Sequence, residues 1–274
     1  MSGEVYEIHA LKYAHHDRYS HENFLLGDAH DVLQPLAYFV WLLRSGRRTI
    51  LVDTGFDDVT ARARGRTITT PVGDGLLALG ADPASIEHII ITHLHYDHCG
   101  NHDLFPRATY HLQDTEMAYA TGRHMRHPVM RIPFECDDIV AIVRKVFGGR
   151  VVFHDGADEI APGVSVHRIG GHSKGLQCVR VDTARGAVVL ASDATHLYAH
   201  LDEGRVYPVT YNVAEVLEGY DTLRKLAASA DHVIPGHDPA VLDRFPPTSP
   251  ALAGVAARLD VAPRSMLIGQ PAQG

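Results

Sequence analysis

Short apolar runs separated by turn residues recur along most of the chain, and their lengths are those of β-strands. Glycine, proline and aspartate lie between these runs and mark where they end. We expect strands at Leu36–Arg44, Arg48–Asp53, His88–Thr92, Ala108–His111, Val151–His154, Val164–Ile169, Gln177–Asp182, Ala187–Ser192 and His232–Ile234. The pattern is that of a chain rich in strands with a few helices between them.

Helical periodicity predicts four helices along the same chain. The expected helices are Val72–Leu79, Asp114–Tyr119, Asp137–Phe147 and Ala214–Ala228. The last has one apolar stripe at i, i+3 and i+4 spacing, which we assign to the hydrophobic core. Its members are Val216, Leu217, Tyr220, Leu223 and Leu226.

Three segments lack a clear period. Gly55–Pro71 and Gly122–Pro133 are expected to be long loops, which are either pocket walls or surface excursions. Residues 245–274 are rich in Ala and Pro, and we expect a peripheral tail there. No repeat or linker divides the 274 residues, and a domain usually takes about 100–200 residues. We therefore predict a single domain over residues 1–274.

The composition narrows the class of protein. Hydrophobic residues make up 45% and charged residues 21%, and no apolar run is long enough to span a membrane. The formal net charge of −8 disfavours nucleic acid and anionic membrane surfaces as partners. The three cysteines are scattered, which argues against thiolate metal sites and a disulfide framework. The amino terminus lacks a cationic segment followed by an apolar one, so we expect a cytoplasmic protein.

The chain contains 20 histidines, and its sharpest motif reads His-Leu-His-Tyr-Asp-His at residues 93–98, directly after an apolar run. Alternate side chains at the end of a strand face the same side, so His93 and His95 can face one metal ion. The chain that follows can bring Asp97 and His98 to a second. Neutral imidazole and carboxylate are suitable ligands for Zn²⁺ and related divalent ions.

Three further ligand-type residues follow expected strands. His172 comes after the Gly170-Gly171 turn, Asp193 ends the run Val188–Ser192, and His237 follows Val233–Gly236. Open sheets gather their active sites at the carboxyl ends of strands. Together with the histidine motif, these positions predict a metal site built from several strands.

With these residues in place, the chain resembles the metallo-β-lactamase superfamily, and within it the N-acylhomoserine lactonase-like hydrolases. The resemblance implies a mixed α/β fold, a four-layer αββα sandwich in which two sheets face each other and helices cover their outer faces. The metal centre is expected at one edge of the sandwich. The matching elements are Leu51–Gly55, His93–His98, Gly171–Ser173, Ser192–Ala194 and Pro235–Asp238.

The resemblance also implies a ligand set for two divalent ions, most simply Zn²⁺. Asp193 is expected between the two ions, while Asp53 orients the ligand loop from outside the ligand set. The ligands implied for the first ion are His93, His95 and His172, and those for the second are Asp97, His98 and His237.

Ligand identity favours hydrolysis among the activities of this superfamily. His95 stands where flavodiiron-type members have Glu, and β-lactamases lack a counterpart of Asp193. The implied reaction is the opening of a lactone ring by a metal-bridging hydroxide, as in quorum-quenching N-acylhomoserine lactonases, with Asp97 moving the proton. Alternatives are another cyclic amide, ester or thioester at the same centre, or a phosphodiester, which the acidic net charge disfavours.

Two positions depart from the lactonase pattern. The third residue after the bridging aspartate is a tyrosine in well-known homoserine lactonases and His196 here, so either His196 or Tyr198 is expected to contact the substrate carbonyl. Lys174 stands where relatives commonly have proline, and it is either a contact for a substrate carboxylate or a solvated turn residue. Further candidate substrate contacts are Phe24 and Tyr211.

Arg62, Arg64 and Arg66 alternate with other residues in the loop after Asp53. They form either an anion-facing rim or ordinary surface. The expected partner is a small-molecule substrate, and the resemblance makes a homodimer a plausible assembly.

Overall fold

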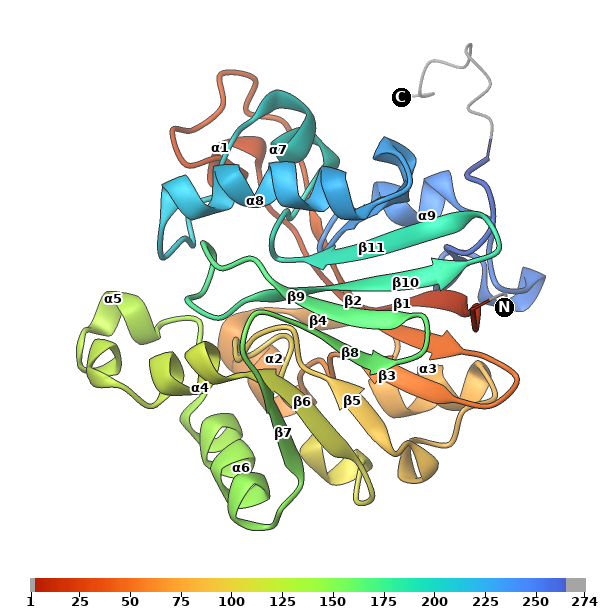
Figure 1. The fold of residues 1–274 in the computed structure, drawn as a ribbon. Coiled ribbons are helices and arrows are strands. Elements are labelled where there is room, and N and C mark those ends of the chain that lie inside the picture. Colours follow the sequence, from red (N-terminus) through yellow and green to blue (C-terminus); the bar gives the residue numbers. More distant parts are fainter. Residues whose placement is uncertain (1–2, 265–274) are drawn as a thin grey trace.

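Two β-sheets pack face to face, and helices cover their outer faces (Figure 1). The structure is a computed structural model that describes residues 3–264. Helix α8 (Val213–Leu226) lies over one sheet, while α4 (Asp114–Ala120) and α6 (Cys136–Phe147) lie on the far side of the other. This arrangement confirms the predicted αββα sandwich. Among the described residues, no helix is long and apolar enough to cross a membrane.

The larger sheet has eight strands in the order β13-β1-β2-β3-β5-β6-β7, with β4 paired to β1. Antiparallel pairing joins β1 to β2 and β2 to β3, and parallel pairing joins β3 through β5 and β6 to β7. Its strands are β1 (Glu7–His16), β2 (Leu36–Arg44), β3 (Thr49–Val52), β4 (Thr67–Ile68), β5 (His88–Ile90), β6 (Thr109–Gln113), β7 (Val151–His154) and β13 (Ala256–Arg258).

The smaller sheet has five strands in the order β12-β11-β10-β9-β8. Its only parallel pair is β11 with β12, where the register shifts between Leu190 and Ser192, at the carboxyl end of β11. Its strands are β8 (Ala157–Ala161), β9 (Val164–Arg168), β10 (Gln177–Thr183), β11 (Gly186–Ser192) and β12 (Val233–Pro235).

Strand β2 shows why its apolar run is uninterrupted. Phe39 and Trp41 face a core that also contains Val179 and Leu190 of the smaller sheet, so this core lies between the sheets. The alternate residue Val40 belongs to a second core under the outer helices. A strand that is covered on both faces needs apolar residues at every position. The shared core supports the expectation of a single domain, which stays a prediction.

Helices begin and end at residues with suitable capping geometry. Asp57 accepts a hydrogen bond from Thr60 N at 2.8 Å at the start of α2, which ends at Gly65 in the left-handed conformation (φ 63°). Asn212 accepts from Ala214 N at 3.0 Å at the start of α8. The other helices are α1 (Ser20–Asn23), α2 (Asp58–Arg64), α3 (Val72–Ala78), α5 (Pro128–Arg131), α7 (Tyr198–Glu203) and α9 (Ala240–Arg244).

Several sequence-based expectations were wrong. Residues 55–71 contain α2 and β4 rather than a plain loop, and residues 122–133 contain the short helix α5. The expected peripheral tail contributes β13, which pairs with β1 and carries buried Ala257 beside buried Leu259. Residues 265–274 lie outside the described part. On α8, Leu217 is exposed because it is one residue, and so about 100°, away from the stripe that Val216 begins.

Candidate metal centre

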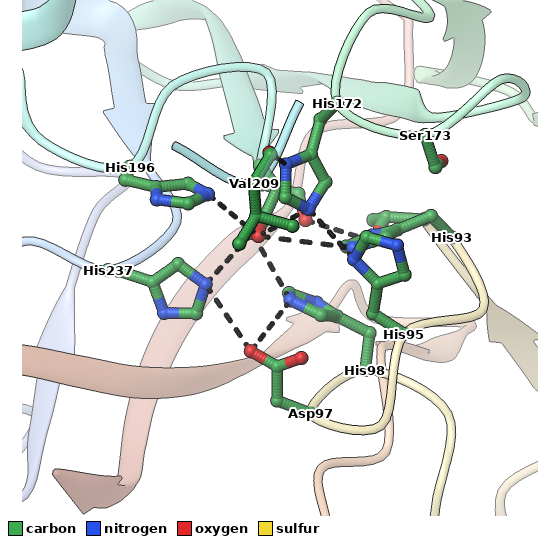
Figure 2. A network of polar contacts seen from close by, with 12 residues as sticks. His93, His95, Asp97, His98, His172, Ser173, His196, Val209 and His237 are labelled. Carbon is green, nitrogen blue, oxygen red and sulfur yellow. Dashed lines mark hydrogen bonds and ion pairs between the residues drawn. The ribbon is translucent and has the colours of Figure 1, made fainter. Parts of the chain in front are cut away.

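Loops at one end of the two sheets bring the predicted ligands together. The histidine motif follows β5, His172 follows β9, Asp193 follows β11, and His237 follows β12. Figure 2 shows His98, His172, His196 and His237 pointing toward a common centre, with Asp97 beside it. Every ligand predicted from the sequence is buried at this place.

The carboxylate of Asp193 lies in the middle of this cluster, and its two oxygens face different histidines. Oδ2 lies 3.1 Å from His172 Nε2 and 3.9 Å from His93 Nε2. Oδ1 lies 3.1 Å from His98 Nε2 and 3.0 Å from His237 Nε2. The side chain thus spans two sets of imidazoles, as a carboxylate shared by two ions must.

The residues on each side of Asp193 form two candidate ligand groups. In each group the ligand atoms all lie within 4.8 Å of one another. The first group consists of His93, His95 and His172, and the second of Asp97, His98, Asp193 and His237. A third overlapping group adds a residue outside the predicted ligand set, since it consists of His172, Asp193 and His196.

Hydrogen bonds on the far side of three rings orient them toward the centre. His172 Nδ1 lies 2.7 Å from Val209 O, and His237 Nδ1 lies 2.9 Å from Ala37 O. His98 Nδ1 lies 2.8 Å from Asp53 Oδ2. Since Nδ1 of each ring donates to an oxygen, Nε2 is the ring nitrogen that faces the centre in all three. This is how histidine ligands are fixed in metal sites.

Asp53 connects the end of β3 to the ligand loop. Its backbone is left-handed (φ 61°), which aspartate tolerates better than most residues. Its carboxylate accepts hydrogen bonds from Thr92 N at 2.7 Å and from Thr92 Oγ1 at 2.8 Å, in addition to His98. The geometry is consistent with the orienting role implied by the resemblance.

We expect Asp53→Asn to weaken zinc binding by about 10- to 100-fold, the usual effect of losing a partner of a histidine ligand. Asparagine also tolerates a left-handed backbone, so the change acts mainly on the bond to His98. Equilibrium dialysis against a competing chelator measures the affinity. Asp58→Asn, at an exposed position on α2, is the matched control. Equal zinc affinity in the Asp53→Asn variant and the unaltered protein would remove this role from Asp53.

Electrostatics at His93, His95 and Asp193 favour the protonation states that metal binding requires. Burial lowers the pKa of His93 and of His95 well below the usual range of histidine, which keeps both rings neutral. Burial acts to raise the pKa of Asp193, but the surrounding imidazoles, His237 and His98 foremost, bring it well below its ordinary value. Neutral imidazole and ionised carboxylate are the forms that bind divalent metals. At His98 and His237, burial acts to lower the pKa, but the surrounding carboxylates, Asp193 foremost, raise it above the usual value of histidine.

Several buried polar atoms in the cluster have no hydrogen-bond partner and are suited to bind metal ions. Of the buried side-chain atoms that lack a hydrogen-bond partner among the described residues, three belong to predicted ligands: His93 Nε2, His98 Nε2 and Asp193 Oδ1. Buried polar atoms in folded proteins almost always have a partner. Divalent ions of the zinc type accept both imidazole nitrogen and carboxylate oxygen. The residues present therefore fit two such ions.

His196 lies in the cluster beside Asp193. Its Nε2 is 3.0 Å from Asp193 Oδ2, and its ring stacks on Tyr207 with centroids 3.7 Å apart. The Tyr207 hydroxyl donates to the backbone oxygen of Asp193, so one buried tyrosine supports both residues.

The other predicted substrate contacts are scattered. Tyr211 lines the pocket beside His95 and His172. Tyr198 packs under Arg244, whose guanidinium carbon is 4.1 Å from the ring centroid, and belongs to the inter-sheet core. Phe24 is buried beneath Arg205 and lines a different pocket. Lys174 is absent from the described wall of the pocket over the cluster.

Glu116, which the sequence analysis missed, joins two ligand loops. Its buried carboxylate accepts from Leu94 N at 3.0 Å in the histidine motif. It also accepts from Ser173 Oγ and Gly175 N, both at 2.8 Å, in the loop of His172. A Cβ at position 175 would lie 2.2 Å from Glu116 N, so only glycine permits this approach.

Comparison with known proteins places this site in a family. The family model described as "Metallo-beta-lactamase superfamily" matches residues 31–250, which is most of the chain. N-acyl homoserine lactonase AttM of Azorhizobium caulinodans is 28% identical over 177 residues, which cover 61% of this chain and 64% of that protein. N-acyl homoserine lactonase AiiA of Bacillus thuringiensis subsp. kurstaki is 27% identical over 183 residues, which cover 61% and 68%. The chain thus matches less than two thirds of the length of AttM.

Solved structures show the same fold. A quorum-quenching N-acyl homoserine lactone lactonase superimposes with a TM-score of 0.70 at 24% identity, covering 87% of this chain and 94% of that one. AidC, a dizinc quorum-quenching lactonase, superimposes with a TM-score of 0.68 at 16% identity, covering 87% and 90%. The family match, the fold and the buried histidine and aspartate cluster agree. The chain belongs to the metallo-β-lactamase superfamily.

Proposed function

We propose that the protein is a dinuclear zinc hydrolase that opens a lactone ring, with N-acyl homoserine lactones as the first candidate substrates. The observation that supports this proposal most directly is the position of Asp193, whose two oxygens face two separate groups of ligands. The curated relatives AttM and AiiA, both N-acyl homoserine lactonases, support the substrate class.

Two divalent ions at such a centre would lower the pKa of a water molecule toward about 7 and polarise the carbonyl under attack. Asp97 is placed to move the proton, since its Oδ2 lies 3.4 Å from His98 Nε2 and 3.6 Å from His237 Nε2. Burial acts to raise the pKa of Asp97, but His98 above all lowers it well below its ordinary value. Asp97 is therefore ionised, which is the form that binds a divalent ion and accepts a hydrogen bond from a water molecule. In this proposal it orients the attacking water and afterwards passes the proton to the leaving oxygen.

His196 is positioned to hold the carbonyl oxygen of the substrate. It lines the pocket together with Asp97 and Asp193, and its ring is fixed by stacking on Tyr207. An imidazole N–H aimed at this oxygen would stabilise the negative charge that develops there. In this proposal it takes the place of the tyrosine found in well-known homoserine lactonases.

We expect His196→Phe to lower kcat by about 10- to 100-fold, in line with the loss of one donor to a developing oxyanion. Phenylalanine keeps the stacking on Tyr207 but removes the N–H, together with the contact between Nε2 and Asp193 Oδ2. Initial rates of lactone opening at saturating substrate measure the change, and His30→Phe at an exposed position is the control. An unchanged kcat would mean that His196 has only a structural role.

The pocket offers an apolar surface for an acyl chain. Besides His95 and His172 it includes an apolar wall, which we define as Tyr119, Val129, Met130, Val209 and Tyr211. Aromatic and aliphatic side chains of this kind take up the apolar part of small ligands, while the polar groups at the metal centre orient the reacting part. An N-acyl substituent therefore has a place beside the centre.

Proton release, followed with a pH indicator, tests the reaction. The zinc-loaded protein is given N-acyl homoserine lactones of different chain lengths, and in parallel a cyclic amide, a thioester and a phosphodiester. We expect rapid opening of the lactones that a chelator abolishes. If the protein hydrolyses the thioester or the amide and opens no lactone, it is a hydrolase of that alternative substrate class and not a lactonase. A cytoplasmic location and a homodimer stay predictions.

A further inference from the structure

Three arginines line the pocket over the metal centre, and the apolar wall residues Tyr119 and Tyr211 line a neighbouring pocket that shares His95 and His172 with it. We call Arg18, Arg64 and Arg66 the cationic wall, since they border the same cleft as Asp97, Asp193 and His196. Arg18 follows β1, Arg64 ends α2, and Arg66 precedes β4. Three segments that are separate in the sequence thus bring positive charge to one side of the site.

Contacts through two tyrosines join this wall to the ligand cluster. Arg66 Nε donates to the Tyr96 hydroxyl at 3.0 Å, and that hydroxyl lies 3.2 Å from the Tyr38 hydroxyl. The Tyr38 ring packs edge-on against the ring of His237, with centroids 5.0 Å apart. Arg64 lies over the same Tyr96 ring, its guanidinium carbon 4.0 Å from the centroid. Arg64 and Arg66 are therefore held in place beside the centre.

Two of the three guanidinium groups lack a carboxylate partner. Arg64 pairs with Glu135 at 2.7 Å. Within the described residues, neither Arg18 nor Arg66 forms an ion pair, and Arg18 Nε is buried without a hydrogen-bond partner. Arg18 Nη2 donates to the backbone oxygen of Glu22, whose carboxylate instead accepts from Tyr19 N at 2.8 Å.

Glu22 near Arg18 and Asp97 near Arg66 supply negative charge that faces these cations, but within the described residues neither forms an ion pair with them. His16 lies 3.2 Å from Arg66 Nη1, and burial together with Arg66 and Arg18 lowers the pKa of His16 to about 4, so it is neutral at pH 7. Partly burying a charged group without a partner is costly. A guanidinium fork matches a carboxylate with two parallel hydrogen bonds.

We propose that the substrate is an anionic ester or lactone, whose carboxylate binds to Arg66 and Arg18 while its reacting carbonyl lies beside Asp193. This inference rests on the proposed hydrolytic function and names the substrate class for it. The apolar wall takes the apolar part of the molecule, and the cationic wall distinguishes an acid from its neutral counterpart.

A pair of substrates tests the preference: N-succinyl homoserine lactone, which ends in a carboxylate, and its methyl ester. We expect kcat/KM of the zinc-loaded protein to be about 10-fold or more higher for the acid, the effect of one charge-assisted hydrogen bond. Arg66→Gln and Arg18→Gln should each bring the ratio close to one, and Arg66→Lys should keep part of it. Arg62→Gln, exposed on α2 and outside the described pocket wall, should leave the ratio unaltered. Equal kcat/KM for acid and ester in the unaltered protein would overturn the proposal.

Binding measured by calorimetry separates this inference from the hydrolytic function. Glutarate and inorganic phosphate are titrated into the zinc-loaded protein and its variants. Glutarate binding that Arg66→Gln weakens at least about 10-fold and Arg62→Gln leaves unaltered supports the carboxylate site, even where neither lactone is opened and the hydrolytic function fails. Glutarate binding that is indifferent to Arg66 overturns the site. Phosphate that binds more tightly than glutarate through Arg66 overturns the assignment to a carboxylate.

Discussion

Asp193→Asn is expected to abolish both the retention of two zinc ions and lactone hydrolysis. The substitution keeps the size of the side chain but removes the charge that faces His172 on one side and His98 and His237 on the other. The loss in hydrolysis should exceed the roughly 100-fold that follows from losing an outer partner of a ligand. Zinc content by mass spectrometry and initial rates of ring opening measure the two effects.

The fold should survive this substitution, because Asp193 lies in a loop after β11 and the two sheets pack through an apolar core. Circular dichroism of the Asp193→Asn variant should match that of the unaltered protein. Asp202→Asn, at an exposed position in α7, should leave zinc content and rate unchanged. Full activity in the Asp193→Asn variant would refute the bridging role.

Glu116→Ala is expected to cause the largest loss of stability among the changes considered. It deprives Leu94 N and Gly175 N of their acceptor, and two buried donors left without partners cost about 2–6 kcal/mol together. Because Leu94 and Gly175 belong to the loops of His93 and His172, zinc affinity should fall as well. Urea unfolding followed by circular dichroism measures the stability, and equilibrium dialysis measures the zinc affinity.

Glu159→Ala is the matched control, since Glu159 is exposed on β8. We expect the control to change the free energy of unfolding by less than about 0.5 kcal/mol. If Glu116→Ala also falls within that range, the two ligand loops hold their geometry without it. The contacts that hold the two loops together would then lie elsewhere, for instance in the packing of Gly175 itself.

The predictability of the fold differed from strand to strand for a physical reason. Leu36–Arg44 and Val151–His154 were predicted with the bounds that β2 and β7 have, because apolar residues bounded by turns mark them locally. Strand β1, Glu7–His16, was missed, since its sequence contains Lys, Ala and three His residues, which weaken the strand signal. Its burial comes from its three strand neighbours, β2, β4 and β13, and from both cores, which only the folded chain brings together.

Only those site residues could be predicted whose type and local sequence context by themselves indicate metal binding. His93 and His95 stand in a motif, and His237 follows a strand, so residue type and local context pointed to metal binding. Glu116 resembles an ordinary acid in the first turn of a helix, and its partners lie 22 to 59 residues away. Arg66 looked like either a rim or surface residue until the fold placed it over Tyr96.

A zinc titration of the metal-free protein, with the rate of N-hexanoyl homoserine lactone opening as the readout, tests the central claim most directly. If Asp193 holds two ions between its groups of histidines, the rate should rise with added zinc and level off at two equivalents per chain. A rate that levels off at one equivalent would contradict the dinuclear centre. No opening of either this lactone or the anionic N-succinyl homoserine lactone at any zinc concentration would contradict the lactonase function itself.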